Sequence, residues 1–339
     1  MTRLTYLLLL ATLPGMAFSS TVADSYADRP EARTFAADME REYGIPAGQT
    51  LDLLAHARPV TAVLKAIQPP ANPAIRSWRS YRSRFVEPRR IAAGLRFWQA
   101  HAATLARAEA EYGVPQDIVV AIIGVETIYG KHMGRFQTLS ALATLAFDYP
   151  PRAELFRHEL ESLLLLAREQ NRSVLSYQGS YAGALGLPQF LPSSERRYAV
   201  DFDGDGKVDL ATSAADAIGS VAHFLAEHGW EKGGPILTPA TVSGEKAELL
   251  LAEGIEPKRM AGDLAAFGVE APDAPVGAAA LIDYVTPDAA TEYRLGYHNF
   301  YVITRYNRSS FYATAVADLA EALRQARGSE NRVMPNAIP

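Results

Sequence analysis

One helical segment, in which Glu126 is the only acid after Asp117, constrains the fold of this chain more than any other stretch. Residues 112–130 read YGVPQDIVVAIIGVETIYG, which is apolar on nearly every side before Glu126. Pro115 is typical of a first helical turn, and Gly130 is typical of the left-handed residue that ends a helix. A helix that is apolar all round is a buried core helix, and the run from Ile118 to Val125 is too short to cross a bilayer. The rest of the chain must therefore pack around this helix.

Glu126 is expected near the C-terminal end of that helix, among apolar neighbours. Burial disfavours the charged form of a carboxyl group, so its pKa rises and the group can stay protonated near neutral pH. A general acid requires this state. The alternative is that Glu126 points to solvent from an otherwise buried helix, since glutamate is seldom fully buried.

The first twenty residues, MTRLTYLLLLATLPGMAFSS, have the pattern of an export signal. One basic residue precedes an apolar run and small residues, which predicts a signal peptide over residues 1–19. A membrane anchor is the alternative, but Pro14 and Gly15 interrupt a run shorter than the roughly 20 residues that a span requires. The chain contains no cysteine, so disulfides and a lipid-bearing cysteine are excluded. We expect a periplasmic protein that is not a lipoprotein.

Length, charge and periodicity narrow the fold class and the partners. The 339 residues are enough for two or three subdomains, and the formal net charge of -5 argues against nucleic acid as the main partner. Strong helical periodicities surround the central helix, whereas residues 236–297 mix a short helix with turns and strand-like pieces. The pattern predicts a mainly α (α+β) fold with a small inserted α/β subdomain.

Two segments carry residue types that suit a sugar-binding cleft. SYQGSYAGALGLPQFLPSS, residues 176–194, combines small residues, which allow close backbone approach, with polar and aromatic side chains such as Gln189. SWRSYRSRFVEP, residues 77–88, combines aromatic and basic residues around Tyr81. A glycine-rich turn is the alternative for the first segment, and an amphipathic packing segment is the alternative for the second.

An EF-hand-like loop is predicted over residues 201–212. Asp201, Asp203 and Asp205 fall at positions 1, 3 and 5, and Lys207 falls where the backbone carbonyl is the ligand. Carboxylates this close repel one another without a cation. This pattern predicts a structural calcium ion, with an unoccupied acidic turn as the alternative.

The last position of the loop departs from the usual pattern. Thr212 stands where a bidentate glutamate is normally found, so a further ligand must come from elsewhere. Asp216 is the nearest candidate. Its alternative role is to cap the helix that begins after Ser213.

Four segments, taken in this order, resemble the murein transglycosylase B family of soluble and membrane-bound lytic transglycosylases. They are GVETIYG, SYAGALGLPQFLPSS, DFDGDGKVDL followed by ADAIGSVAHFLAEHGW, and NFYVITRYN. The resemblance covers nearly all of the mature chain. It implies a goose-type lysozyme-like helical core, peptidoglycan glycan strands as substrate, no organic cofactor, and enzymes of cell-wall synthesis or remodelling as candidate partners.

The resemblance also implies a domain organisation. An N-terminal helical region over residues 20–90 is followed by the catalytic core over residues 91–235. The small α/β subdomain covers residues 236–297, the chain returns to the core over residues 298–327, and residues 328–339 form a flexible tail.

When the residues of these motifs are matched to those of the family, the resemblance implies a role for each site residue. Glu126 is the single catalytic acid, and the cleft is lined by Tyr81, Ser180, Gln189 and Tyr306. The calcium loop is formed by Asp201, Asp203, Asp205, the carbonyl of Lys207, and Asp216.

Most glycosidases use two carboxyl groups, whereas the motifs here supply one. The resemblance implies that the substrate supplies the rest, through its N-acetyl group and its own 6-hydroxyl. Glu126 would protonate the glycosidic oxygen between N-acetylmuramic acid and N-acetylglucosamine and then accept the proton of the 6-hydroxyl, leaving a 1,6-anhydromuramoyl end. A hydrolytic muramidase and a non-catalytic peptidoglycan-binding protein are the alternatives.

Overall fold

A computed structural model describes residues 25–69 and 77–333 of the chain. The predicted signal peptide over residues 1–19 lies outside these ranges. Within them, no helix combines the length and the apolar character that a membrane crossing requires. Helices dominate and strands are few, so the predicted mainly α (α+β) class is confirmed.

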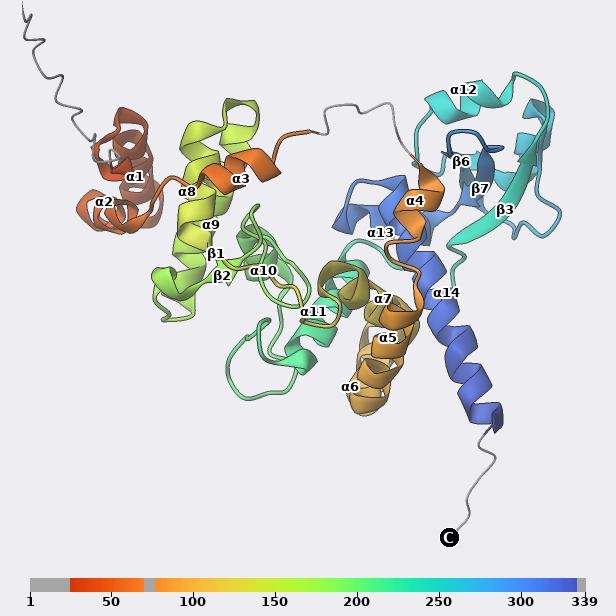
Figure 1. Ribbon diagram of the computed structural model, residues 1–339, viewed down its shortest axis with the longest axis horizontal. Coiled ribbons are helices and arrows are strands. Elements are labelled where there is room, and N and C mark those ends of the chain that lie inside the picture. The colour runs from red at the N-terminus through yellow and green to blue at the C-terminus, as the bar shows by residue number, and fades with distance from the viewer. Residues whose placement is uncertain (1–24, 70–76, 334–339) are drawn as a thin grey trace, which may run out of the picture.

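An N-terminal helical layer shares one apolar core with two helices from the middle of the chain. This layer lies at the left of Figure 1, and its buried side chains, such as Met39, Leu54 and Leu163, form a continuous cluster. The N-terminal elements of this core are η1 (Tyr26–Asp28), α1 (Pro30–Tyr43), α2 (Ala47–His56) and α3 (Thr61–Ala66). The elements from the middle of the chain are α8 (Thr138–Asp148), η2 (Pro150–Arg152) and α9 (Ala153–Glu169).

The predicted central helix is α7 (Gln116–Thr127), and it lies inside a second core. Every residue of α7 from Asp117 to Val125 is buried, as its apolar character on all sides predicts. The helices that form this core with it are α4 (Trp78–Arg82), α5 (Pro88–Ala100), α6 (Ala102–Tyr112), α11 (Ala214–Glu227), α13 (His298–Tyr306) and α14 (Ser310–Val333).

A five-stranded antiparallel sheet occupies the segment predicted to be a small α/β subdomain. The strand order is β4-β6-β7-β3-β5, and the sheet lies at the right of Figure 1. Its elements are β3 (Leu237–Val242), α12 (Ala247–Ala252), β4 (Arg259–Met260), η4 (Ala261–Phe267), β5 (Val269–Glu270), β6 (Ala278–Tyr284) and β7 (Glu292–Gly296).

Strand β6 joins this sheet to the helical core. Successive side chains of a strand point to opposite faces, and Ala280, Ile282 and Tyr284 belong to the core around α7. Ala279 and Leu281 belong instead to the separate core of the small subdomain. Because alternate side chains of β6 pack into the two cores, this one strand attaches the sheet to the helices.

Two short strands and two short helices border the glycine-rich segment. Strand β1 (Phe136–Gln137) pairs antiparallel with β2 (Gln178–Gly179), and η3 (Val174–Ser176) leads into β2. Helix α10 (Pro192–Tyr198) follows the glycine-rich segment.

The segment predicted to be a flexible tail, residues 328–339, is described only as far as residue 333. Helix α14 continues to Val333, and Ser329 Oγ donates to the Gln325 carbonyl at 2.9 Å within it. The reason is that the helix, once formed on the core, propagates at little cost per residue.

Candidate active site

Glu126 lies in the last turn of α7 and is partly exposed, while the residues that precede it are buried. Its Oε1 accepts a hydrogen bond from the Tyr312 hydroxyl at 2.6 Å. Burial raises the pKa of Glu126 from 4.5 to about 7, and the Tyr312 hydrogen bond acts in the opposite direction. The carboxyl group is therefore partly protonated at neutral pH and within reach of solvent.

The helix end that carries Glu126 is an unusual turn. Ile128 is the left-handed cap with φ 51°, and Tyr129 follows with φ 57°, so the helix ends before Gly130, where the sequence pattern suggests its end. Positive φ is unfavourable for a β-branched residue. Thr127 holds the turn, because its Oγ1 donates to the Leu187 carbonyl at 3.0 Å and accepts the Gly130 N–H at 2.9 Å.

Tyr129 closes the space behind this turn. Its ring packs beside Phe97, with centroids 5.3 Å apart. A Cβ atom at Gly94 or at Gly124 would lie 2.3 Å or 2.4 Å from the Tyr129 hydroxyl oxygen. Glycine at both positions therefore lets this ring pack against α5 and α7.

Tyr306 lies near Glu126, as the resemblance implies. Its hydroxyl donates to the Pro188 carbonyl at 2.6 Å, and its ring stacks on Tyr312 with centroids 6.4 Å apart. Burial raises the pKa of both tyrosines well above 10, and the charge of Glu126 raises it further. Both hydroxyls stay neutral and can donate hydrogen bonds at neutral pH.

Tyr81 lies on α4 and packs against Phe311, the residue before Tyr312. Burial raises its pKa, and the charge of Glu126 raises it further. The ring of Tyr81 packs on Phe85 and Phe311 at centroid distances of 5.0 Å and 5.6 Å.

Ser180 and Gln189 hold the backbone of the glycine-rich segment. Ser180 Oγ accepts the Ala184 N–H at 3.1 Å. Gln189 has φ 54°, and its Nε2 donates to the carbonyls of Gly186 at 2.8 Å and Met133 at 3.2 Å. This segment is tied to the end of α7 through Leu187, the acceptor of Thr127.

Tyr312 is a further candidate site residue, which the sequence motifs do not predict. It lies 186 positions from Glu126 along the chain, at the start of α14, and no short motif links the two. The available signal was a second tyrosine six positions after Tyr306, in the run RYNRSSFY.

The predicted calcium loop brings three carboxylates together. One oxygen each of Asp201, Asp203 and Asp205 lies within 4.8 Å of the others, and all three side chains are exposed. Asp201 also accepts the N–H groups of Gly204 at 2.7 Å and Gly206 at 2.8 Å, which folds the loop around it. An arrangement of hard oxygen ligands suits a calcium ion.

Asp216 is placed differently from these three. It is 1% exposed, and its oxygens accept the N–H groups of Phe202 and Asp209, each at 2.8 Å. The capping contact is present as well, because Ser213 Oγ accepts the Asp216 N–H at 3.1 Å. Asp216 therefore braces the loop backbone, and the carboxylates that converge are those of the other three residues.

A second buried acid with a raised pKa, Glu195 on α10, has surroundings unlike those of Glu126. Burial raises its pKa to about 7, while the Gln170 amide, which donates to it at 3.0 Å, and the charge of Arg172 lower it. It is 6% exposed. Glu195 is almost out of reach of solvent and has the charge of Arg172 near it, whereas Glu126 is partly exposed, so Glu126 is the better candidate for a catalytic acid.

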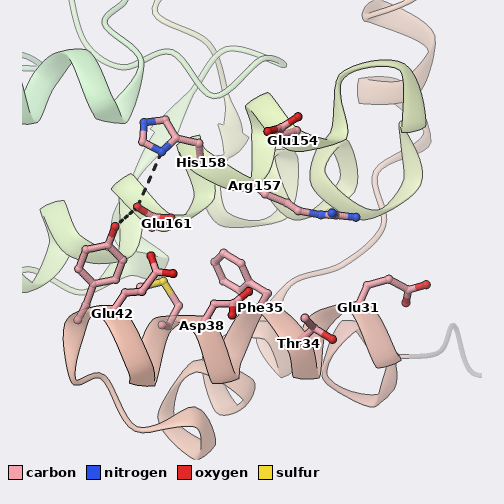
Figure 2. A pocket seen from close by; sticks show the side chains of 11 residues that line it. Glu31, Thr34, Phe35, Asp38, Glu42, Glu154, Arg157, His158 and Glu161 are labelled. Atoms are coloured by element: carbon pink, nitrogen blue, oxygen red, sulfur yellow. Dashed lines mark hydrogen bonds and ion pairs between the residues drawn. The ribbon is translucent and has the colours of Figure 1, made fainter.

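An acidic pocket of about 360 Å³ lies between α1 and α9, and Figure 2 shows its lining. Glu31, Asp38, Glu42 and Glu154 surround it, and Glu161 accepts a hydrogen bond from Tyr43. In Figure 1 these two helices lie well to the left of α7. This pocket is therefore separate from the site around Glu126.

The chain matches the family model described as "Transglycosylase SLT domain" over residues 27–321. It is 40% identical over 313 residues to the "Membrane-bound lytic murein transglycosylase B" of Escherichia coli (strain K12), covering 89% of this chain and 85% of the relative.

Three solved structures share the fold. The soluble lytic transglycosylase SltB1 of Pseudomonas aeruginosa is 46% identical with a TM-score of 0.82, covering 88% of this chain and 100% of that chain. The Escherichia coli lytic transglycosylase Slt35 in complex with calcium is 38% identical with a TM-score of 0.78, covering 89% and 95%. SltB3 of Pseudomonas aeruginosa in complex with NAG-NAM-pentapeptide is 32% identical with a TM-score of 0.75, covering 87% and 79%.

Proposed function

The chain belongs to the family of lytic transglycosylases that carry the transglycosylase SLT domain, and we propose that it uses Glu126 to cleave the glycan strands of peptidoglycan. The bond cleaved joins N-acetylmuramic acid to N-acetylglucosamine, and the product carries a 1,6-anhydromuramoyl end. The observation that carries this proposal is a partly exposed acid whose pKa is about 7 and whose oxygen accepts the Tyr312 hydrogen bond.

Glu126 acts in both halves of the reaction. Its protonated form gives a proton to the glycosidic oxygen as the bond to the anomeric carbon breaks. The N-acetyl group of the same sugar stabilises the positive anomeric carbon. The ionised Glu126 then accepts the proton of the 6-hydroxyl as that oxygen closes the anhydro ring, so the acid is restored.

The Tyr312 hydroxyl supports the ionised half of this cycle. A neutral donor at 2.6 Å stabilises the carboxylate that forms when Glu126 loses its proton. Burial opposes ionisation, so the two effects together keep the pKa near neutrality. This balance suits one group that must be acid first and base second.

A single carboxyl group is consistent with the electrostatics. Among the residues that the structure describes, only burial and Tyr312 are causes of the Glu126 pKa shift. A second catalytic carboxylate at the short separation of retaining glycosidases would raise that pKa by repulsion. This supports the proposed mechanism, in which one carboxyl group moves the protons and the 6-hydroxyl of the substrate is the nucleophile.

We assign the sugar-binding surface around the acid to four residues. Tyr81 and Tyr306 offer aromatic rings near Glu126, and Ser180 and Gln189 fix the loop that passes the end of α7. These groups would hold the strand with its glycosidic oxygen toward the acid.

Digestion of purified sacculi followed by mass spectrometry tests the proposal. The expected muropeptides end in anhydro sugars and are lighter by one water than the products of hydrolysis. Hydrated ends would identify a hydrolytic muramidase in the same site. Failure to release any soluble fragment would indicate a binding protein without catalysis.

We also propose a structural calcium ion in the loop over residues 201–212. Asp201, Asp203, Asp205 and the carbonyl of Lys207 would hold it, and the converging carboxylates support this set. A calcium complex of Slt35 supports the choice of cation. The ion would stiffen the connection between α10, which follows the Gln189 segment, and α11.

Removal of the cation is expected to destabilise the protein. Without calcium the three carboxylates repel one another, so a chelator should lower Tm by several degrees, and added calcium should restore it. Differential scanning calorimetry in EDTA and in excess calcium measures the shift. A Tm that is the same in both conditions would contradict calcium binding by the loop.

The remaining assignments concern location. We propose that residues 1–19 are a signal peptide removed on export, and that the mature enzyme works in the periplasm without a lipid anchor, since the chain has no cysteine.

A further inference from the structure

A polar cavity of about 520 Å³ lies between α9, α10, α11 and α13. Its lining carries arginine, histidine and serine side chains from α9, α10 and α13, and His228, which follows α11. No carboxylate lines it among the residues described by the structure. A cavity with this composition suits an anionic ligand.

Two arginines at this cavity have no acidic partner. Arg196 is paired with Glu169 at 2.7 Å, but Arg197 and Arg305 form no ion pair with any described residue. The Arg197 guanidinium lies 5.2 Å from the centroid of the Tyr198 ring. Both arginines therefore keep donors that a carboxylate can use in a bidentate contact.

Two buried polar atoms at the cavity also have no hydrogen-bond partner in the described part of the chain. They are Ser162 Oγ and Arg305 Nε, and the Ser162 side chain is fully buried. A buried donor without a partner costs free energy, which a bound polar group recovers. These atoms point independently to a ligand with acceptor oxygens.

Two acids of α9 that neighbour the lining residues His158 and Ser162 in the chain are already engaged. Both oxygens of the buried Glu159 accept hydrogen bonds from Ser193, from its N–H at 3.0 Å and from its hydroxyl at 2.7 Å. Glu161 accepts a hydrogen bond from Tyr43 and lies 3.8 Å from His158 Nδ1. The repulsion that these carboxylates exert on an anion is reduced by these donors.

Aromatic side chains connect the cavity to the catalytic acid. Phe224 lines the cavity, and its ring packs on Tyr306 with centroids 4.9 Å apart. Tyr306 stacks on Tyr312, which donates to Glu126. Two tyrosines therefore separate the cavity wall from the acid.

We propose that this cavity binds carboxylate groups of the peptide attached to N-acetylmuramic acid while the glycan strand lies at Glu126. The inference rests on the proposed function and names the part of the substrate that the cavity recognises. An extended pentapeptide spans about 17 Å. The complex of SltB3 shows that a relative binds a sugar that carries such a peptide.

The test compares two substrates, peptide-bearing glycan strands and the same strands after enzymatic removal of the peptides. For Arg197→Gln, the ratio of kcat/KM on peptide-bearing to peptide-free strands is expected to fall roughly tenfold, through a higher KM, because a charge-assisted hydrogen bond is lost. Arg197→Glu should lower the ratio further by repulsion. Arg305→Gln is expected to lower it in the same direction.

Arg96→Gln is the matched control, since Arg96 is an exposed arginine on α5 outside the cavity. It should leave the ratio at the wild-type value, and an equal fall in this variant would mean that net charge alone is responsible. A wild-type ratio in both Arg197 variants would overturn the inference while leaving the proposed function intact. If the wild-type protein cleaves neither the peptide-bearing nor the peptide-free strands, the proposed function is overturned, and this inference with it.

Discussion

Glu126→Gln is expected to lower kcat on peptidoglycan by roughly a thousandfold or more, because one group provides both proton transfers. Glutamine keeps the size of the side chain, and its Oε1 can still accept the Tyr312 hydrogen bond that the wild type forms at 2.6 Å. The fold should therefore survive. Release of anhydro-muropeptides from sacculi measures the effect, and wild-type release by this variant would exclude Glu126 as the catalytic acid.

The free energy of unfolding of Glu126→Gln provides a control, because its difference from the wild type should depend on pH in a known direction. The pKa of Glu126 is about 7 in the folded protein and 4.5 in the reference state, so the folded state binds more protons between these values. Wild-type stability therefore falls as pH rises from 4.5 to 7. Glu126→Gln should lack this loss and exceed the wild type at pH 8 by up to about 3 kcal/mol, with little difference below pH 4.

The pH profile separates the two influences on the acid. Wild-type kcat/KM is expected to fall as pH rises through about 7, because the protonated form of Glu126 starts the reaction. The Tyr312 hydrogen bond lowers that pKa, so Tyr312→Phe should move the fall to higher pH as well as lowering kcat. An unmoved alkaline limb in Tyr312→Phe would mean that another group governs it.

Periodicity and residue type were enough to predict the elements that carry the site. The apolar run before Glu126 predicts that this part of α7 is buried on all sides, and it is buried in the structure. A helix without a polar face exposes apolar side chains in any orientation at the surface, so it packs inside the core. The acidic spacing in Asp201, Asp203 and Asp205 predicts convergence because loop geometry is local. Local patterns of this kind need no knowledge of the tertiary fold.

Local patterns do not predict contacts between segments that lie far apart in the chain. The amphipathic sequence of α9 shows that one face is buried, but it does not show that this face packs with the N-terminal helices. Tyr312 reaches Glu126 only because α14 packs along α7. Asp216 has the residue type of a calcium ligand, yet three backbone N–H groups direct its oxygens to the loop backbone.

Gly134→Ala is expected to cause the largest loss of stability among single-methyl additions near the site. Gly134 has φ +93°, and a Cβ atom there would lie 2.0 Å from the Gly179 carbonyl oxygen and 2.4 Å from the Ser180 nitrogen. These atoms belong to backbone that β1 and β2 fix by pairing, with Phe136 opposite Gly179. The clash cannot be relieved by a side-chain rotation, so the Ser180 segment must move.

The expected cost is about 2–4 kcal/mol in the free energy of unfolding, the sum of left-handed strain and overpacking. Gly44→Ala is the matched control, because Gly44 has φ +65° with nothing within 4 Å of its Cβ position. It carries the strain alone, which corresponds to about 1 kcal/mol. Urea unfolding of both variants measures the difference. Activity should fall in Gly134→Ala only, because Ser180 belongs to the glycine-rich segment, which the Thr127–Leu187 hydrogen bond ties to the turn after Glu126. Equal costs for the two variants would mean that the β1–β2 connection yields freely and does not fix the Ser180 segment.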